Sequence, residues 1–264
     1  MNLKLTNKTA LITGSTSGIG YATAKLLAQE GVEVILNGRK QVSLEKAVKK
    51  LQEEIPEAKI KGIAADFEVA EEVDGLIKML GDIDILINNV GIYSSKSFYE
   101  TTDEDWFRHF EVNVMSGVRL SRAILPKMLE RNWGRIIFIS SECATLVPDD
   151  LIAYSMTKTA LLSVSRGLAQ LCKGSEVTVN SVLPGSTLTE GAESFLEALA
   201  EKEGTTVQQA EADFFTNIRT SSLLARFAKV EEVASTIAYL CSPLAVATNG
   251  ASIKVDGGST GGII

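Results

Sequence analysis

The sequence is poor in histidine and cysteine, with one histidine and three cysteines among 264 residues. The single histidine, His109, argues against a Ser-His-Asp hydrolase and against a histidine-ligated metal centre. The three cysteines lie far apart and form no CxxC motif, so they indicate neither a disulfide framework nor a zinc site. We therefore expect no bound metal and a reducing compartment, the cytoplasm.

Long apolar runs and surplus positive charge are also missing. No stretch reaches the roughly 18 apolar residues that span a bilayer, and the amino terminus has no apolar leader segment. The formal net charge of −7 disfavours nucleic acid and anionic membranes as partners. With only five prolines and no repeat or flexible linker, residues 1–264 are expected to form a single domain.

What the sequence does contain is a regular alternation of short β-branched runs and amphipathic stretches. The runs predict strands near 9–13, 33–37, 59–65, 84–88, 135–140, 177–183 and 252–256. The amphipathic stretches predict helices near 19–30, 43–55, 70–80, 103–131, 152–173 and 230–242. Apolar strands that alternate with helices predict an α/β fold, a doubly wound parallel sheet with helices on both faces.

Three glycines, Gly14, Gly18 and Gly20, crowd the turn TGSTSGIG between the first predicted strand and the first predicted helix. A strand, a glycine turn and a helix N-terminus together place backbone N–H groups against a phosphate. By itself the glycine pattern also fits a tight turn that binds no ligand.

Polar residues follow two further strands. Asn88-Asn89-Val90-Gly91 ends the fourth strand, beside the first one, where ligands bind in such sheets. Ser140-Ser141 ends the fifth. Tyr154 and Lys158, four apart on the next helix, project from one face, and a lysine there would lower the tyrosine pKa from its usual value of about 10. The alternative for this pair is a solvated helix surface.

Together these residues resemble the short-chain dehydrogenase/reductase family over nearly the whole chain. The matching motifs are Thr13-Gly14…Gly18-Ile19-Gly20, Asp66, Asn88-Asn89-x-Gly91, Asn113, Ser141, Tyr154-x-x-x-Lys158 and Pro184-Gly185. The thirteen-residue step to Tyr154 selects Ser141 over Ser140 as the family's serine.

The resemblance implies seven parallel strands and reversible hydride transfer between a nicotinamide and a carbonyl or alcohol. It makes Tyr154 the proton donor in reduction and the base in oxidation, with Lys158 lowering its pKa and holding the nicotinamide ribose. It makes Ser141 a hydrogen-bond partner of the substrate oxygen, and Asn113 a residue that helps order a water between Lys158 and solvent. Two fixed donors aimed at one oxygen stabilise the charge that develops on it.

The resemblance also implies the cofactor-binding residues. Asp66 would meet the adenine amine, although capping the following helix is an alternative, and Thr187 or Thr189 would lie near the nicotinamide amide. The full set is Gly14, Ser15, Thr16, Ser17, Gly18, Ile19, Gly20, Asn37, Arg39, Asp66, Asn89, Gly91, Tyr154, Lys158, Pro184, Gly185, Thr187 and Thr189.

The end of the second strand bears on which nicotinamide cofactor is used. Its sequence, Leu36-Asn37-Gly38-Arg39-Lys40, lacks the carboxylate that binds a ribose 2′-hydroxyl in NAD-selective folds. Arg39, helped by Asn37, could instead bind a 2′-phosphate. The alternative is that Arg39 and Lys40 are solvated loop cations, and Ser17 stands where NADP-specific members often have Arg or Lys. We expect NADP(H) to be preferred, with NAD(H) possible.

Residues 186–226 form an unusually long connection with no strand expected among them. The pattern predicts a helix over 190–203, with Ala192, Phe195, Leu196 and Leu199 on one face, and a second after a capping box at 206–209, with Val207, Ala210, Phe214 and Ile218 on one face. We expect a helical lid over the active site that closes after the cofactor binds. The alternative is a pair of surface helices that complete the core.

The lid charge and the motifs together predict the reaction. Seven acids against three cations give the segment a balance of −4: Glu190, Glu193, Glu197, Glu201, Glu203, Glu211 and Asp213 against Lys202, Arg219 and Arg226. This charge disfavours a coenzyme A tail or an acidic carrier. We expect a small, largely uncharged ketone, aldehyde or secondary alcohol. The alternatives are a non-catalytic dinucleotide sensor or scaffold, a 3-oxoacyl thioester reductase, and an epimerase or dehydratase of the extended branch, whose additional C-terminal domain is missing.

The resemblance further implies a homotetramer with two-fold axes. Helices 103–131 and 152–173 resemble those that form one subunit contact in the family. The terminal segment 251–264, which ends in Ile263 and Ile264, resembles a second contact. The alternative for that segment is a frayed terminus.

Overall fold

The computed structural model describes residues 2–262, so Ile263 and Ile264, which we assigned to a subunit contact, lie outside the described residues. A seven-stranded parallel sheet has the strand order β3-β2-β1-β4-β5-β6-β9. The strands are β1 Thr9–Ile12, β2 Glu33–Gly38, β3 Ile60–Ala64, β4 Ile85–Asn88, β5 Gly134–Ile139, β6 Val177–Pro184 and β9 Ser252–Val255. The order reverses between β1 and β4, which confirms the doubly wound fold.

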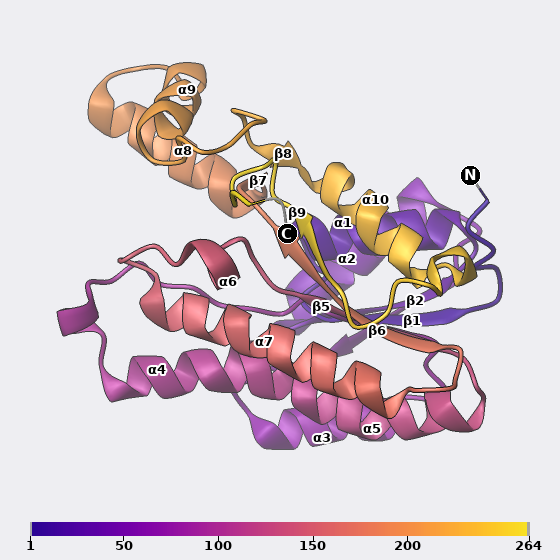
Figure 1. Cartoon of the computed structure of the whole chain (residues 1–264). Helices are drawn as coiled ribbons and strands as arrows, with labels where there is room; N and C mark the ends of the chain where they lie inside the picture. Colours follow the sequence, from indigo (N-terminus) through magenta and orange to yellow (C-terminus); the bar gives the residue numbers. More distant parts are fainter. Residues whose placement is uncertain (1, 263–264) are drawn as a thin grey trace.

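The helices cover both faces of this sheet (Figure 1). One face packs against α1 Gly18–Gln29, α2 Gln41–Glu54 and α10 Val230–Cys241. The other packs against α3 Ala70–Met79, α5 Ser116–Glu130 and α7 Ile152–Leu171. Strands β4, β5 and β6 are buried along their entire length, as a doubly covered parallel sheet requires.

The predicted helix over 103–131 is not a regular α-helix throughout. It consists of α4 Asp103–Phe110, a π-helical turn Glu111–Met115 and α5. Asn113 lies in the middle of that turn. π-helical turns are rare and occur frequently at functional sites.

Residues 186–226 contain two helices, α8 Glu190–Glu203 and α9 Val207–Asn217, as expected. The expectation of no strand was wrong, because β7 Thr187–Leu188 pairs with β8 Ala228–Lys229 at the base of the segment. We call residues 186–226 the cap segment. In Figure 1 its helices project beyond the helices that flank the sheet, at the upper left.

The cap segment has a small apolar core of its own. Its buried members are Leu196, Ala200, Ala210, Phe215 and, just beyond the segment, Phe227. The apolar stripe expected on the second helix is partly wrong, since Val207 is 39% and Ile218 55% exposed while Phe215 is buried. Thr206 caps α9 by accepting a hydrogen bond from the Gln209 backbone N–H, but the Gln209 side chain bonds Asp213 instead of closing the box.

Within residues 2–262, no helix has the length and apolar character needed to cross a bilayer.

Candidate active site

The glycine turn between β1 and α1 is held open by backbone conformation and by a neighbouring asparagine. Gly14 and Gly18 have φ values of +58° and +57°, a region that side chains disfavour. A Cβ on Gly20 would lie 2.6 Å from the Asn89 side-chain nitrogen. That Asn89 nitrogen donates to the carbonyl oxygens of Thr13 and Gly14, each at 2.9 Å. The glycines themselves carry no side chains, so the turn has room for a dinucleotide pyrophosphate at the N-terminus of α1, where the Gly18 N–H donates to the Glu190 carboxylate in this structure.

Two of the expected cofactor residues in this turn have structural bonds of their own. Ser15 is buried, and its hydroxyl donates to the Ile12 carbonyl at 2.7 Å. Asn37 is also buried; its side-chain oxygen accepts from the Gly14 N–H, and its nitrogen donates to the Ile63 carbonyl. These side chains stabilise the turn. The Asn37 amide already forms hydrogen bonds within the protein, and these bonds would compete with its expected contribution to binding a 2′-phosphate.

The region where the adenosine part of the cofactor is expected to bind is open. Arg39 is exposed and forms no ion pair with any residue in the described chain. The neighbouring Gly38 is buried, and a Cβ there would meet the Thr16 methyl group at 2.4 Å. Asp66 accepts a hydrogen bond from the Glu68 backbone N–H, which closes a turn before α3, while the N-cap of that helix is Val69. The helix-cap alternative for Asp66 is therefore wrong.

Tyr154 and Lys158 lie on α7 and point into the fold near the end of β5. The Lys158 ammonium is buried, donates to the Ile139 carbonyl at 2.9 Å, and lies 5.4 Å from the centroid of the Tyr154 ring. The solvated-surface alternative for this pair is wrong, because Lys158 is only 4% exposed. Ser141 follows β5, and its hydroxyl oxygen accepts from the Cys143 N–H at 3.1 Å.

The protonation of this pair differs from the sequence-based expectation. Burial raises the pKa of the Tyr154 phenol, and the Ser141 hydroxyl counteracts only part of this shift. Burial also lowers the pKa of Lys158 from 10.5 to about 8, a value at which the ammonium still carries most of its positive charge at neutral pH. Lys158 is not among the groups that shift the Tyr154 pKa in the protein without cofactor, so the expected lowering of this pKa by Lys158 stays a prediction. The phenol holds its proton at neutral pH, which is the form that donates to a carbonyl oxygen.

Asn113 fixes the segment that follows the Asn88-Asn89-Val90-Gly91 motif. Its side-chain oxygen accepts from the Ile92 N–H at 2.7 Å. Its nitrogen donates to the Ile92 carbonyl and to the Thr157 hydroxyl at 2.9 and 3.0 Å. Asn113 thus connects Ile92 to the helix that carries Tyr154. The preceding Gly91 lies so close to Lys158 that a Cβ on it would be 3.2 Å from the ammonium. The expected role of Asn113 in ordering a water stays a prediction.

A cavity of about 580 Å³ joins the glycine turn to these side chains. The expected site residues that line it are Ser17, Ile19, Gly20, Asn89, Gly91, Ser141, Tyr154, Lys158, Pro184, Gly185, Thr187 and Thr189. The other expected residues lie elsewhere: Gly14, Ser15, Thr16, Gly18, Asn37, Arg39 and Asp66 in or beside the glycine turn and the next two strand ends, and Asn113 behind Gly91. The cavity volume lies in the range typical of small-molecule sites.

The loop after β6 closes this cavity from the cap side. Gly185 packs so tightly that a Cβ would lie 2.7 Å from the Asp256 backbone. The Thr187 hydroxyl donates to the Gly185 carbonyl, and Thr189 caps α8 by accepting from the Ala192 N–H. Both threonines line the cavity, so neither is favoured over the other as the residue near the amide.

The sequence reasoning named Phe195, Phe214 and Arg219 only as members of the predicted lid, and it did not name Phe227, Ser95 or Asp150 as site residues. Phe195, Phe214 and Phe227 form part of an aromatic cluster under the cap helices, and Arg219 follows α9. Ser95 and Asp150 are joined by a 2.7 Å hydrogen bond at the opposite rim. The aromatic residues of the cap segment could be recognised from the sequence as part of an apolar surface. None of the family motifs includes Arg219, Ser95 or Asp150.

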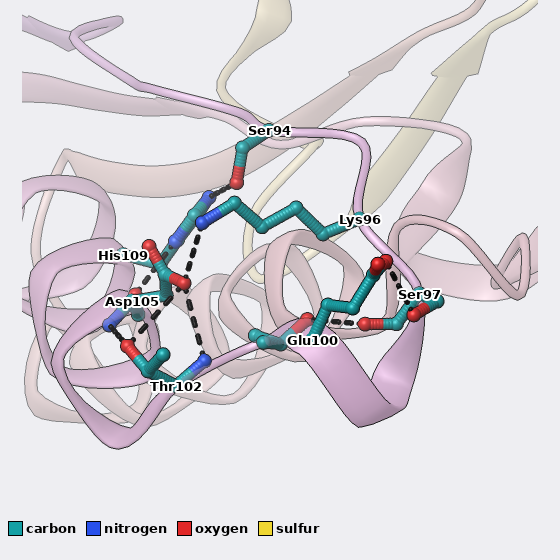
Figure 2. Close-up of polar contacts among 8 residues, drawn as sticks. Ser94, Lys96, Ser97, Glu100, Thr102, Asp105 and His109 are labelled. Atoms are coloured by element: carbon teal, nitrogen blue, oxygen red, sulfur yellow. Dashed lines mark hydrogen bonds and ion pairs between the residues drawn. The ribbon is translucent and has the colours of Figure 1, made fainter.

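A polar network holds the rim segment around Ser95 against α4 (Figure 2). Ser94 contacts His109 with 3.4 Å between the hydroxyl oxygen and Nε2, and Lys96 donates to the Asp105 carboxylate at 2.7 Å. His109 is buried and participates in this packing. Among the residues that the structure describes, no three His, Cys, Asp or Glu side chains come together as a metal site.

Comparisons with known proteins agree with this geometry. A family model described as short chain dehydrogenase matches residues 8–200. Two uncharacterized oxidoreductases of Bacillus subtilis (strain 168) are similar over 98% of this chain and 98% of their own: YvaG at 46% identity and YvrD at 48%. The crystal structure of L-sorbose reductase from Gluconobacter frateurii, complexed with NADPH and L-sorbose, has a TM-score of 0.93 at 32% identity and covers 100% of both chains.

Proposed function

Because the chain belongs to the short-chain dehydrogenase family, we propose that it transfers hydride between NADP(H) and a small, largely uncharged ketone, aldehyde or secondary alcohol. The chain is an oxidoreductase of this family. The preference for NADP(H), the substrate class and the roles of individual residues are the proposed part.

The observation that carries the proposal is the meeting of Ser141, Tyr154 and Lys158 in one cavity with the glycine turn. The nicotinamide, when bound, supplies or accepts the hydride. Tyr154 then donates its proton to the carbonyl oxygen in reduction and removes it from the alcohol in oxidation. Ser141 donates a hydrogen bond to the same oxygen and stabilises its developing charge. Lys158 would hold the nicotinamide ribose.

Two observations support NADP(H). The end of β2 carries no carboxylate, and the exposed Arg39 beside it has no partner among the described residues. An arginine fork suits a 2′-phosphate because it can donate two parallel hydrogen bonds. The similar L-sorbose reductase was crystallised with NADPH.

The cavity supports a compact and uncharged substrate. Phe195, Phe214 and Phe227 give it an apolar wall, and its charged members besides Lys158, which are Arg219 and Asp150, carry opposite signs. The acids of the cap segment would repel an acyl thioester attached to coenzyme A or to an acidic carrier. This is the reason to prefer a small carbonyl compound over the 3-oxoacyl thioester alternative.

A panel of carbonyl compounds with NADPH, followed by loss of its absorbance, tests the proposal. We expect turnover of small neutral ketones or aldehydes, faster with NADPH than with NADH. A chain that binds NADPH but turns over no carbonyl compound and oxidises no alcohol would be the non-catalytic sensor. Efficient turnover of acyl thioesters would contradict the charge argument.

A further inference from the structure

Arg219 projects into the cavity from the residues that follow α9, next to the turn that carries Ser141. It lines the cavity, and its side chain is only 15% exposed. Its partner is Glu142, the residue after Ser141, which lies 77 positions earlier in the sequence. Ordering and burying a charged side chain costs free energy. The position of Arg219, which extends from the cap segment to the turn that carries Ser141, therefore suggests that the guanidinium has a function there.

The Arg219 guanidinium is held on two sides. Its Nε donates to Glu142 Oε1 at 3.2 Å, and its central carbon lies 5.9 Å from the centroid of the Phe214 ring. Glu142 is itself fixed, since its side chain is 4% exposed and its backbone N–H donates to the Pro184 carbonyl at 2.8 Å. The other carboxylate oxygen, Oε2, is buried without a hydrogen-bond partner among the described residues. Arg219 is therefore the main support of this buried carboxylate.

This arrangement leaves part of the Arg219 fork unused. A guanidinium has five N–H donors, and only the one on Nε is used by Glu142. Neither Nη nitrogen of Arg219 donates a hydrogen bond to a side chain or backbone acceptor within residues 2–262, and neither is an enclosed atom. Since Arg219 lines the cavity, a molecule bound there can reach these donors.

The charges around the Arg219 guanidinium favour a substrate acceptor atom that carries no charge. Glu142 and Arg219 form an ion pair with no net charge, and Asp150 adds a carboxylate to the lining of the same cavity. Lys158, the other cation that lines the cavity, already donates to the Ile139 carbonyl, and Asp150 would repel a substrate carboxylate or phosphate. A hydroxyl oxygen accepts a hydrogen bond from the guanidinium without bringing a charge.

We propose that Arg219 binds a hydroxyl oxygen of the substrate other than the reacting carbonyl oxygen, so that the preferred substrates are neutral hydroxy ketones and the corresponding diols. Glu142 acts as a positioning residue that orients the guanidinium. This inference rests on the proposed function and narrows its substrate class.

The test compares 2-pentanone with its monohydroxy derivatives, each reduced with NADPH. A hydrogen bond to a charged group predicts that at least one derivative exceeds the parent ketone in kcat/KM by about tenfold or more. Arg219→Gln is expected to remove most of this preference, chiefly by raising KM for the hydroxy derivatives, and the preference is measured in each variant as the ratio of kcat/KM for the derivative to that for 2-pentanone. Arg226→Gln is the matched control, because Arg226 pairs with the half-exposed Glu232 outside the cavity.

Arg219→Lys separates substrate binding from a merely structural ion pair. Its single ammonium can keep the pair with Glu142 but lacks the fork, so we expect it to lose the hydroxyl preference as well. Glu142→Gln leaves the Arg219 charge uncompensated and is expected to shift selectivity toward the keto acid 4-oxopentanoate. Titration of NADPH fluorescence checks that each variant still binds cofactor.

The outcomes distinguish the two proposals. Turnover of 2-pentanone without any hydroxyl preference, full rescue by Arg219→Lys, or a wild-type preference for 4-oxopentanoate would overturn the role of Arg219 and leave the proposed function standing. No turnover of any ketone would overturn the proposed function, and this inference with it.

Discussion

The backbone N–H of Gly18 donates a 3.0 Å hydrogen bond to the Glu190 carboxylate. Gly18 is the first residue of α1, and Glu190 is the first residue of α8 in the cap segment. A carboxylate therefore lies on one of the donors that would receive the cofactor pyrophosphate. The positive end of the helix dipole favours an anion at this position, whichever group supplies it.

We expect Glu190→Gln to bind NADPH about tenfold more tightly than the wild type. The amide keeps the size of the side chain but competes less well for the Gly18 N–H and does not repel the pyrophosphate. Fluorescence titration of NADPH measures the effect. Glu197→Gln, an exposed change on the same helix, is the control, and equal affinities of the two variants would show that Glu190 does not compete with the cofactor.

The same contact bears on cap closure. If the cofactor displaces Glu190, a contact between the cap segment and the glycine turn is lost, and the cap segment can then move about the β7–β8 pair at its base. That motion is what the expectation of a lid requires, and it stays a prediction.

Tyr154→Phe is expected to lower turnover by about 10²-fold or more and to leave NADPH affinity nearly unchanged, because the substitution removes only the proton donor. Steady-state kinetics and NADPH titration measure the two effects separately. Tyr99→Phe is the control, since Tyr99 is 95% exposed. Normal turnover by Tyr154→Phe would assign the general acid to another residue.

Lys158 gives a prediction for stability against pH. Its pKa is about 8 in the folded protein and close to 10.5 when unfolded, so the unfolded chain binds more protons between these two values. Stability from this group therefore rises as pH increases from 8 to 10.5, by at most about 3 kcal/mol at ~1.4 kcal/mol per pKa unit.

The measurement is the difference in unfolding free energy between wild type and Lys158→Met, from urea titrations at pH 7.5 and 10. Between pH 7.5 and pH 10, the free energy of unfolding of the wild type should increase relative to that of Lys158→Met. Lys173→Met, at an exposed position near the end of the same helix, should show no such change. Parallel pH dependences for wild type and Lys158→Met would mean that Lys158 titrates normally.

The sheet could be predicted from the sequence because its strands are short apolar runs buried on both faces. The prediction for β5, 135–140, differs from the observed Gly134–Ile139 by one residue at each end. Asn113 was identified by its motif, but its π-helical turn was not, since one extra residue in a helical turn hardly changes the apolar pattern. Its hydrogen bonds to Ile92 could not have been read from spacing.

The contacts that joined the cap segment to the rest of the site were beyond the sequence. Glu142 and Arg219 are 77 positions apart, and Gly18 and Glu190 are 172 apart. Both contacts depend on the path that the cap segment takes over the sheet. From the charge pattern alone, Arg219 would be interpreted as a solvated cation. Likewise, a favourable tyrosine–lysine spacing gives no information on how far burial shifts both pKa values.

The homotetramer expected from the family resemblance receives support from the surface of α4. Phe107 and Phe110 on this helix are 74% and 40% exposed, which is unusual for adjacent aromatic residues of a monomer. We expect light scattering at micromolar concentration to give the mass of a tetramer and Phe107→Glu to give a smaller species. A monomer mass for the wild type would contradict the expectation.

Arg39 is expected to decide between the two nicotinamide cofactors. Because it is exposed, lacks an ion pair among the described residues and follows a strand end without a carboxylate, its fork is free to bind a 2′-phosphate. Arg39→Ala should weaken NADP(H) binding about tenfold or more, as expected for hydrogen bonds between charged groups, and leave NAD(H) binding unchanged.

Lys40→Ala is the matched control, because it removes an equally exposed cation one residue further along the chain. It should weaken NADP(H) binding much less, since a solvated charge contributes little at this distance and salt screens it. The two variants are compared by titrating each cofactor at physiological salt. Tighter binding of NAD(H) than of NADP(H) by the wild type, or equal NADP(H) affinities for wild type and Arg39→Ala, would contradict the proposed role of Arg39.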